Sequence, residues 1–343
     1  MGKRYLITGG AGFIGSNYCH RLLNRGEEVV IYDNLSREGT EKNLAWLYSE
    51  FGKRSFQFIQ EDIRDQDKIS ETAKNADVIV HLAGQVAVTT SVQNPREDFE
   101  INAIGTFNVL EAARLSGKQP VVIYASTNKV YGGMEDLIVK ENSSQYFYQD
   151  FPFGISEERC LDFHSPYGCS KGSGDQYVRD YARIYNLPTI VLRQSCIYGP
   201  RQFGIEDQGW VAWFIIATIL NKTISIYGDG KQVRDLLFIY DLLDVYDQVI
   251  EKVEISKGNV FNIGGGPSNT MSVWSEFGPI LGDILKRPIE VQYGDWRPGD
   301  QRIYVSDIRK AKAILDWEPK ISVKAGIQKL ADWVNKNQNL FQS

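Results

Sequence analysis

The chain has 343 residues, of which 43% are hydrophobic and 24% are charged, and its formal net charge is −5. This composition is typical of a globular protein, and the length is sufficient for two domains. An acidic chain without a basic cluster is poorly suited to hold the backbone of a nucleic acid, so we expect no nucleic-acid partner. Any phosphate group that the chain binds therefore requires positive side chains placed locally.

The amino-terminal residues do not have the pattern of a targeting segment. Lys3 and Arg4 precede an apolar run that is too short for a signal peptide. The longest apolar helix that we expect, residues 210–220, has about half the length of a membrane span. We therefore expect a cytoplasmic protein without a membrane partner. The cysteines show neither metal-type nor redox-type spacing, which predicts reduced thiols and no metal site: Cys19, Cys160, Cys169 and Cys196.

A glycine-rich turn begins at Gly9 and links an expected strand, residues 3–8, to an expected helix that ends near residue 25. This order is the context of a dinucleotide-binding turn, because glycines let the backbone approach a pyrophosphate and the helix start offers N–H donors. The next strand ends in Asp33, whose carboxylate would accept hydrogen bonds from the adenosine ribose and repel a 2′-phosphate. We predict NAD rather than NADP, a preference that Arg37 nearby weakens. The alternative is a glycine turn of another α/β protein.

Further strands are expected at residues 56–60, 78–82 and 121–125, with helical segments between them. Repeated strand–helix units predict an α/β fold with a doubly wound parallel sheet, and ligands of such sheets lie beyond the carboxyl ends of the strands. Residues that follow the strands should therefore line one crevice: Asp33, Asp62, Gly84, Ser126 and Thr127.

The strict alternation fades after residue 193, which predicts a smaller α/β lobe for the substrate. We expect an NAD-binding domain at residues 1–192, joined by part of 234–262, and a substrate domain at 193–343. Arg234 and Arg297 stand beside turns, where two guanidinium groups would clamp a second diphosphate. Each arginine alone would be read as solvated or paired with a carboxylate. The aromatic-rich residues 146–163 are expected to form a loop over the site or to serve packing alone.

Tyr167 and Lys171 are four residues apart in an expected helix, so their side chains share one face. A cation beside a phenol lowers the phenol pKa, and the phenolate can then accept a hydroxyl proton near neutral pH. Such a pair by itself is common by chance and is then a solvated helix face. The preceding glycine turn and Asp33 favour the catalytic interpretation.

Nearly the whole chain resembles the extended short-chain dehydrogenase/reductases, and within them the NAD-dependent nucleotide-sugar epimerases, in particular those that invert C2 of a CDP-sugar. Several segments in the order typical of that family carry the resemblance: the glycine turn, Asp33, Asp62-Ile63, His81–Ala87, Asn102, Ser126–Gly132, His164–Lys171, Gln208–Trp210, Arg234-Asp235 and Arg297–Asp300.

The resemblance implies a Rossmann fold, a tightly bound NAD that is not consumed, a CDP-sugar substrate and a homodimer or higher homo-oligomer. Thr127, Tyr167 and Lys171 would be catalytic. The residues implied to contact the cofactor are Gly9, Gly12, Phe13, Ile14, Asp33, Asn34, Arg37, Asp62, Ile63, Leu82, Ala83, Gly84, Asn102, Ser126, Tyr167 and Lys171. The residues implied to contact the substrate are Gln85, Thr127, Tyr167, Gln208, Arg234, Arg297 and Asp300.

Two departures from the family pattern bear on function. Many relatives have an asparagine at the position of Cys196, so the phosphate contact of that asparagine is in doubt here. Related 4,6-dehydratases carry an Asp-Glu pair that supplies the acid and base for eliminating water. This chain has Asn128 and Lys129 at those positions, so it lacks that acid and base. Two alternatives to the C2 epimerase stay open: a UDP-hexose 4-epimerase with the same catalytic residues, and a non-catalytic NAD-binding sensor or scaffold.

Overall fold

The computed structural model describes residues 2–296 and 300–341. The chain divides into two compact units. Unit 1 comprises residues 1–130, 165–193 and 245–261, and unit 2 comprises residues 131–164, 194–244 and 262–343. The assignment of NAD to one domain and of the sugar nucleotide to the other stays a prediction.

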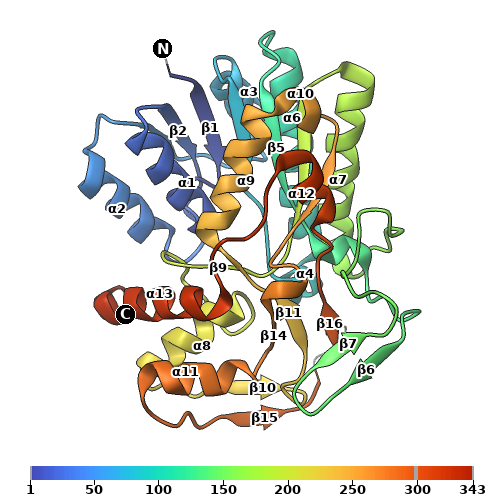
Figure 1. Ribbon diagram of the computed structural model, residues 1–343. Helices are drawn as coiled ribbons and strands as arrows, with labels where there is room; N and C mark the ends of the chain where they lie inside the picture. Colours follow the sequence, from blue (N-terminus) through green and yellow to red (C-terminus); the bar gives the residue numbers. More distant parts are fainter. Residues whose placement is uncertain (1, 297–299, 342–343) are drawn as a thin grey trace. The chain divides into compact units, whose positions relative to one another are not determined.

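The main sheet has seven strands in the order β13-β8-β5-β4-β1-β2-β3 (Figure 1). The pairs β1–β2, β1–β4, β2–β3 and β4–β5 are parallel, and β4 is buried along its whole length, as an apolar strand covered on both faces should be. The predicted doubly wound α/β fold is therefore confirmed. The strands are β1 (Arg4–Thr8), β2 (Glu28–Tyr32), β3 (Gln57–Ile59), β4 (Val78–His81), β5 (Val121–Thr127), β8 (Thr189–Gln194) and β13 (Val260–Ile263).

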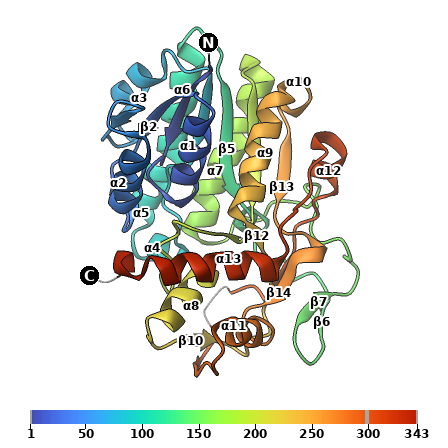
Figure 2. The ribbon, with the colours of Figure 1, turned by 60° about the vertical axis from the view of Figure 1, so that its left-hand side comes forward.

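Helices cover both faces of this sheet. Helices α1 and α2 lie on one face together with residues 245–251 of α9, and α3, α6 and α7 lie on the other (Figures 1 and 2). The helical segments of this part of the chain are α1 (Phe13–Asn24), α2 (Thr40–Phe51), α3 (Gln66–Ala73), α4 (Val88–Gln93), α5 (Pro95–Phe99), the π-helical turn η1 (Glu100–Ile104), α6 (Gly105–Leu115), the 3₁₀ turn η2 (Asn128–Tyr131), α7 (Ser165–Tyr185), α9 (Ile239–Glu251) and α10 (Val253–Ser256).

One apolar core holds the sheet against α3, α6 and α7. Leu6 and Ile79 from the strands pack in one cluster with Ile69 and Leu110 from the helices, and all four side chains are fully buried. Each such side chain contributes about 1.5–3 kcal/mol through burial. The chain runs from β1 to β2 and β3 on one side, and returns to β4 and β5 on the other. The switch in strand order lies between β1 and β4, where sheets of this type hold their ligands.

Unit 2 is built from small sheets and helices. Its helix α8 is apolar on nearly all sides, and Trp210 and Phe214 on it pack against Phe277 of α11, in agreement with the expected core helix. No helix in the described ranges 2–296 and 300–341 combines the length and the apolarity that crossing a membrane requires.

The segment expected as a loop at residues 146–163 instead starts as a strand. Tyr146 to Tyr148 pair antiparallel with residues 139–141, because three successive aromatic side chains that are alternately buried and exposed suit a half-buried strand. The elements of unit 2 are β6 (Val139–Glu141), β7 (Tyr146–Tyr148), β9 (Ile197–Tyr198), α8 (Trp210–Ile219), β10 (Ser225–Tyr227), β11 (Val233–Asp235), β12 (Leu237–Phe238), η3 (Pro267–Asn269), β14 (Thr270–Ser272), α11 (Phe277–Leu285), β15 (Gln292–Gly294), β16 (Ile303–Tyr304), α12 (Arg309–Leu315), α13 (Val323–Lys336) and η4 (Gln338–Phe341).

Candidate active site

The glycine turn between β1 and α1 forms a close backbone approach. Gly9 has a φ of 69°, and a Cβ at this position would lie 2.7 Å from the backbone nitrogen of Ala83. Helix α1 begins at Phe13, and its N-cap residue Gly12 provides no side-chain cap. A helix start reached through a glycine-rich turn suits the pyrophosphate of a dinucleotide. Gly9 and Gly12 lie in this turn and Phe13 and Ile14 open the helix, and their contact with a cofactor stays a prediction.

Asp33 connects the end of β2 to this turn. Its Oδ2 accepts a hydrogen bond from the backbone of Ala11 at 3.0 Å, and its Oδ1 accepts one from Leu35 at 2.9 Å. Burial raises the pKa of the carboxyl group, and these backbone donors oppose the rise. The carboxylate is thus fixed at the turn, at the position expected to meet the adenosine ribose.

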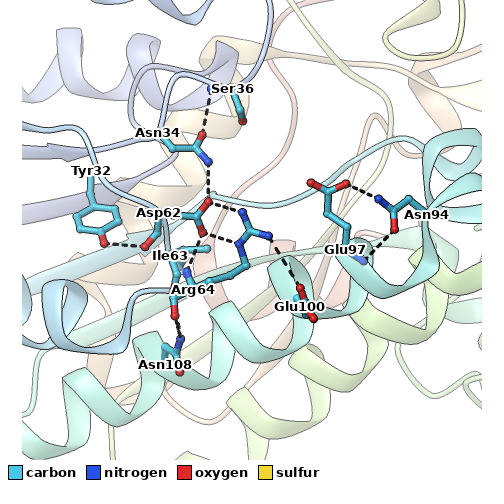
Figure 3. A network of polar contacts seen from close by, with 10 residues as sticks. All are labelled: Tyr32, Asn34, Ser36, Asp62, Ile63, Arg64, Asn94, Glu97, Glu100 and Asn108. Atoms are coloured by element: carbon cyan, nitrogen blue, oxygen red, sulfur yellow. Dashed lines mark hydrogen bonds and ion pairs between the residues drawn. The ribbon is translucent and has the colours of Figure 1, made fainter.

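A polar network follows the ends of β2 and β3 (Figure 3). Asn34 donates to Asp62 at 2.9 Å, and Arg64 binds the same carboxylate through Nε at 2.9 Å and Nη2 at 2.8 Å. These contacts, Arg64 above all, lower the pKa of Asp62 to about 2. The carbonyl of Ile63 accepts from Asn108 at 3.2 Å. Three of the residues implied to contact the cofactor, Asn34, Asp62 and Ile63, therefore lie in one hydrogen-bonded cluster. Arg64 in this cluster was not foreseen, and its place two residues after Asp62 was the available signal.

The turn after β4 is held by Asn102. The Oδ1 of Asn102 accepts from the backbone nitrogen of Gln85 at 2.9 Å, and its Nδ2 donates to the Gln85 carbonyl at 3.0 Å. A Cβ on Gly84 would lie 2.8 Å from the same Oδ1. Leu82 and Ala83 are anchored on Thr8 of β1 through their backbone nitrogens. The side chain of Gln85, a predicted substrate contact, bonds the backbone of Ala87.

Thr127 and Tyr167 meet at the carboxyl end of β5. Tyr167 lies in the first turn of α7, and Ser91 of α4 accepts a hydrogen bond from its backbone nitrogen at 3.1 Å. Burial raises the pKa of the phenol to about 12, while the neighbouring hydroxyl of Thr127 and the charge of Arg37 lower it. The sequence predicts a phenol pKa lowered by Lys171. The structure corrects this expectation, because removal of the phenolate from water outweighs the nearby donors and cations.

Lys171 is buried one helical turn after Tyr167. Burial lowers its pKa to about 7, which the neighbouring carboxylates of Asp175 and Asp98 oppose. Its Nζ lies 4.3 Å from the centre of the Tyr124 ring and 3.8 Å from the position of a Cβ on Gly84. The amine therefore faces the turn after β4, and its contact with the cofactor stays a prediction.

Ser126 has a structural partner inside the unit. Its hydroxyl donates to Asp175 at 2.7 Å, and Arg193 grips the same carboxylate through Nε and Nη2, both at 2.9 Å. Asp175 and Arg193 expose 0% and 2% of their surfaces, so the ion pair is desolvated on both sides. This pair fixes the end of β5 next to Thr127.

The remaining predicted substrate residues belong to unit 2. Arg234 donates to Asp300 at 3.0 Å, so these two predicted contacts form an ion pair. Gln208 forms two backbone hydrogen bonds with Ile205 just before α8. Cys196 lies between β8 and β9 and has a φ of 41°. Arg297 lies outside the described residues, so the two-arginine clamp stays a prediction.

Comparisons with known proteins agree with this geometry. Residues 6–330 match the model of the family described as GDP-mannose 4,6 dehydratase. The chain belongs to this family. It is 45% identical over 339 residues to CDP-paratose 2-epimerase from Salmonella typhi, a match that covers 97% of this chain and 99% of that protein. The predicted resemblance to extended short-chain dehydrogenase/reductases that act on nucleotide sugars is confirmed.

Two solved structures show the same fold along the whole chain. UDP-glucose 4-epimerase from Thermotoga maritima with UDP-glucose has a TM-score of 0.83 at 32% identity, and the match covers 98% of this chain and 99% of that chain. DesIV, a dTDP-glucose 4,6-dehydratase from Streptomyces venezuelae with NAD and TYD bound, has a TM-score of 0.83 at 28% identity, and the match covers 98% of both chains. The chain therefore belongs to the nucleotide-sugar epimerase/dehydratase group of the short-chain dehydrogenase/reductases, in which structural relatives bind NAD.

Proposed function

We propose that the protein is an NAD-dependent epimerase that inverts C2 of a CDP-sugar and interconverts CDP-paratose and CDP-tyvelose. The observation that carries this proposal is the 45% identity to CDP-paratose 2-epimerase, which extends over nearly the full length of both chains. The UDP-glucose 4-epimerase from Mycolicibacterium smegmatis shares 33% over a similar length. The higher identity favours C2 over C4 and CDP over UDP.

The described residues of unit 1 fit a dinucleotide. Any side chain at Gly9 would enter the backbone of the turn after β4, and Asp33 is held at the glycine turn itself by the backbone nitrogen of Ala11. Asn34, Asp62 and Ile63 would hold the adenine end, and Lys171 and Asn102 the nicotinamide end. NAD in this position supplies a hydride acceptor that each catalytic cycle regenerates.

Tyr167 and Thr127 would carry the proton chemistry. The phenolate of Tyr167 takes the proton of the C2 hydroxyl as C2 is oxidised to a ketone. Thr127, which lies beside Tyr167, donates to the oxygen on which negative charge develops. The 2-keto sugar then turns, C2 is reduced on its other face, and Tyr167 returns the proton. Proton and hydride are both restored, so the reaction has no net change in oxidation state.

The residues after Thr127 support epimerisation over dehydration. The amide oxygen of Asn128 accepts a hydrogen bond from the Thr127 hydroxyl at 3.4 Å. The backbone nitrogen of Lys129 donates to the hydroxyl oxygen of Thr127 at 3.3 Å. The resemblance to 4,6-dehydratases places an Asp-Glu pair at these two positions as the acid and base of the elimination. This chain has an amide and a lysine there and lacks that pair, although the matching family model is named after a dehydratase.

A product analysis tests the proposal. The purified protein, without added NAD, is incubated with CDP-, UDP- and GDP-sugars in deuterated water, and the products are followed by NMR. We expect inversion at C2 of the CDP-sugar without deuterium at that carbon. Conversion of UDP-glucose to UDP-galactose with inert CDP-sugars would show a 4-epimerase instead. A Tyr167→Phe variant with unaltered biological activity would show a non-catalytic binding protein.

A further inference from the structure

Ser91 of helix α4 has no part in the proposed reaction, yet its side chain contacts the backbone of Tyr167. It exposes 0% of its surface. Its hydroxyl donates to the carbonyl of Val88 at 2.7 Å and accepts a hydrogen bond from the backbone nitrogen of Tyr167 at 3.1 Å. A hydroxyl carries one hydrogen, so the bond to Val88 leaves a lone pair for Tyr167. The direction of this acceptor is therefore fixed within α4.

The first turn of α7 needs partners from outside the helix. Tyr167 is the third residue of α7, and the backbone amides of a first helical turn have no acceptor inside their own helix. Pro166 has no N–H group. Ser165 has a φ of 63°, and its hydroxyl accepts a hydrogen bond from the backbone nitrogen of Gly168 at 3.2 Å. Ser91 thus satisfies the amide of the residue that carries the phenol.

The second turn of α7 is held by a different set of contacts. The hydroxyl of Ser170 donates to Oδ2 of Asp98 in α5 at 2.5 Å and accepts a hydrogen bond from Asn102 in η1 at 3.1 Å. Because helix ends fray, a hold at Ser170 alone leaves the first turn free to move. The backbone of Tyr167 therefore depends on Ser91 for its position.

Ser91 also connects Tyr167 to the turn after β4. The backbone nitrogen of Ser91 donates to the carbonyl of Ala87 at 3.1 Å. The same carbonyl accepts a hydrogen bond from the side-chain amide of Gln85 at 2.8 Å, and the side-chain oxygen of Gln85 accepts one from the backbone of Ala87. Residues 85–91 therefore form one hydrogen-bonded segment. It begins at a predicted substrate contact and ends on the backbone of the proposed base.

We propose that Ser91 is a positioning residue, whose hydroxyl fixes the first turn of α7, and with it the phenol of Tyr167, relative to the turn after β4. This inference rests on the proposed function, because Ser91 acts through the residue that we propose as the base. The hydrogen bond itself belongs to the folded chain and is measurable without turnover.

The alternative role for Ser91 is simple fastening of α4 to α7. In that case loss of the hydroxyl lowers the stability of the fold and leaves turnover by the folded protein unchanged. A positioning role also lowers kcat, because a small displacement of a base from the reacting hydroxyl slows proton transfer steeply. Cofactor and substrate are held by other residues, so KM and the NAD content stay at the wild-type values. The two roles therefore differ in the split between kcat and KM.

A pair of serine variants separates the two roles. Ser256 in α10 also exposes 0% of its surface, and its hydroxyl donates to the carbonyl of Val249 at 2.7 Å. Ser91→Ala and Ser256→Ala thus remove the same buried group, and rates are measured well below both melting temperatures. We expect kcat to fall by about 10–10²-fold in Ser91→Ala, with KM and NAD content unchanged, and to stay at the wild-type value in Ser256→Ala. Equal kcat values in the two variants overturn the positioning role.

Nitrogen-15 NMR tests the hydrogen bond without turnover. The protein is labelled with [¹⁵N]tyrosine, and the amide signal of Tyr167 is identified by its loss in Tyr167→Phe. In Ser91→Ala we expect the Tyr167 amide proton to move upfield and to exchange faster with solvent, because its acceptor is lost. Ser256→Ala should leave the signal in place. An unchanged Tyr167 signal in Ser91→Ala overturns the proposal.

The wild type provides a check that needs no folded variant. Its Tyr167 amide should be protected from exchange, as is expected for Tyr177 inside the same helix, and rapid exchange at Tyr167 contradicts the proposal. If the wild type shows no epimerase activity, the proposed function fails. The exchange and the NMR comparison then still decide whether Ser91 holds the first turn of α7.

Discussion

Thr127 at the end of β5 lies beside Tyr167 in the first turn of α7, close enough to oppose the rise that burial causes in the pKa of the Tyr167 phenol. A base and an oxyanion donor that lie side by side can act on the same substrate oxygen. Burial raises the pKa of the Tyr167 phenol to about 12. Nearby positive charge, such as that of Arg37, lowers this pKa and so favours the phenolate.

Tyr167→Phe tests the proposed base. The variant keeps the buried ring and loses the group that takes the proton, so we expect kcat for epimerisation to fall by about 10²–10⁴-fold with the fold intact. Tyr177→Phe is the matched control, because this tyrosine lies on the same helix and is half exposed. Product formation by NMR measures the effect. Equal rates in the two variants would remove Tyr167 from the mechanism.

The buried amine of Lys171 predicts how stability depends on pH. Its folded pKa is about 7, below the 10.5 of an unfolded lysine, so the unfolded chain binds more protons between these values. The wild type should therefore gain stability, about 1.4 kcal/mol per pH unit at most, as the pH rises from 7 towards 10.5. Urea unfolding of wild type and Lys171→Met over this range checks the prediction. Their stability difference should change with pH across that window and stay constant below it.

Gly9→Ala tests the cofactor turn. A Cβ would meet the backbone of Ala83 in a left-handed conformation, so we expect loss of bound NAD together with destabilisation. Gly26→Ala has a similar φ of 74° but open space around the new methyl group. It should cost about 1 kcal/mol and retain the cofactor. NAD released on denaturation is the readout, and normal NAD content in Gly9→Ala would contradict the assignment.

Arg64→Gln tests the network at the ends of β2 and β3. Arg64 fixes Asp62 with two hydrogen bonds, so its loss should free the carboxylate and reduce the amount of NAD that copurifies. Arg54→Gln makes the same change on the exposed loop after α2 and serves as the control. If Arg64→Gln and the control retained equal amounts of NAD, the network would have no part in cofactor binding.

A substitution among the exposed apolar side chains of α6 and α7 tests whether the protein forms the expected homo-oligomer. Phe107 and Tyr177 form an edge-to-face pair at 6.0 Å and remain partly exposed, and Ile184 is 66% exposed on α7. We expect Ile184→Glu to shift the protein towards the 38.9 kDa monomer. Ile255→Glu on α10 introduces the same charge elsewhere. Light scattering after gel filtration measures the mass, and a monomeric wild type would refute the expectation.

The arrangement of the sheet followed from the sequence because its signals are local. Apolar runs, glycine turns and the residues that end each strand placed Asp33, Asp62 and Thr127 at one edge of the sheet, and the structure has them there. The spacing of Tyr167 and Lys171 likewise required only a helix. These features depend on the period of a strand or a helix and on little else.

Features that depend on contacts between distant segments were not foreseen. The pairing of Asp98 with Ser170 requires α5 to lie against α7, and no spacing in the chain encodes that contact. The direction of the Tyr167 pKa shift was wrong for the same reason, since burial is set by the packed unit and the sequence shows only the neighbouring Lys171. The hairpin at β6 and β7 was read as a loop because its strands are short.

The most direct test of the central claim follows the hydrogen at C2. A CDP-paratose labelled with deuterium at C2 is converted by the purified protein in ordinary water, without added NAD, and the product is examined by NMR and mass spectrometry. The proposed cycle predicts CDP-tyvelose that retains the deuterium at C2, because the same hydride leaves and returns. Loss of the label to solvent, or turnover only at C4, would contradict it.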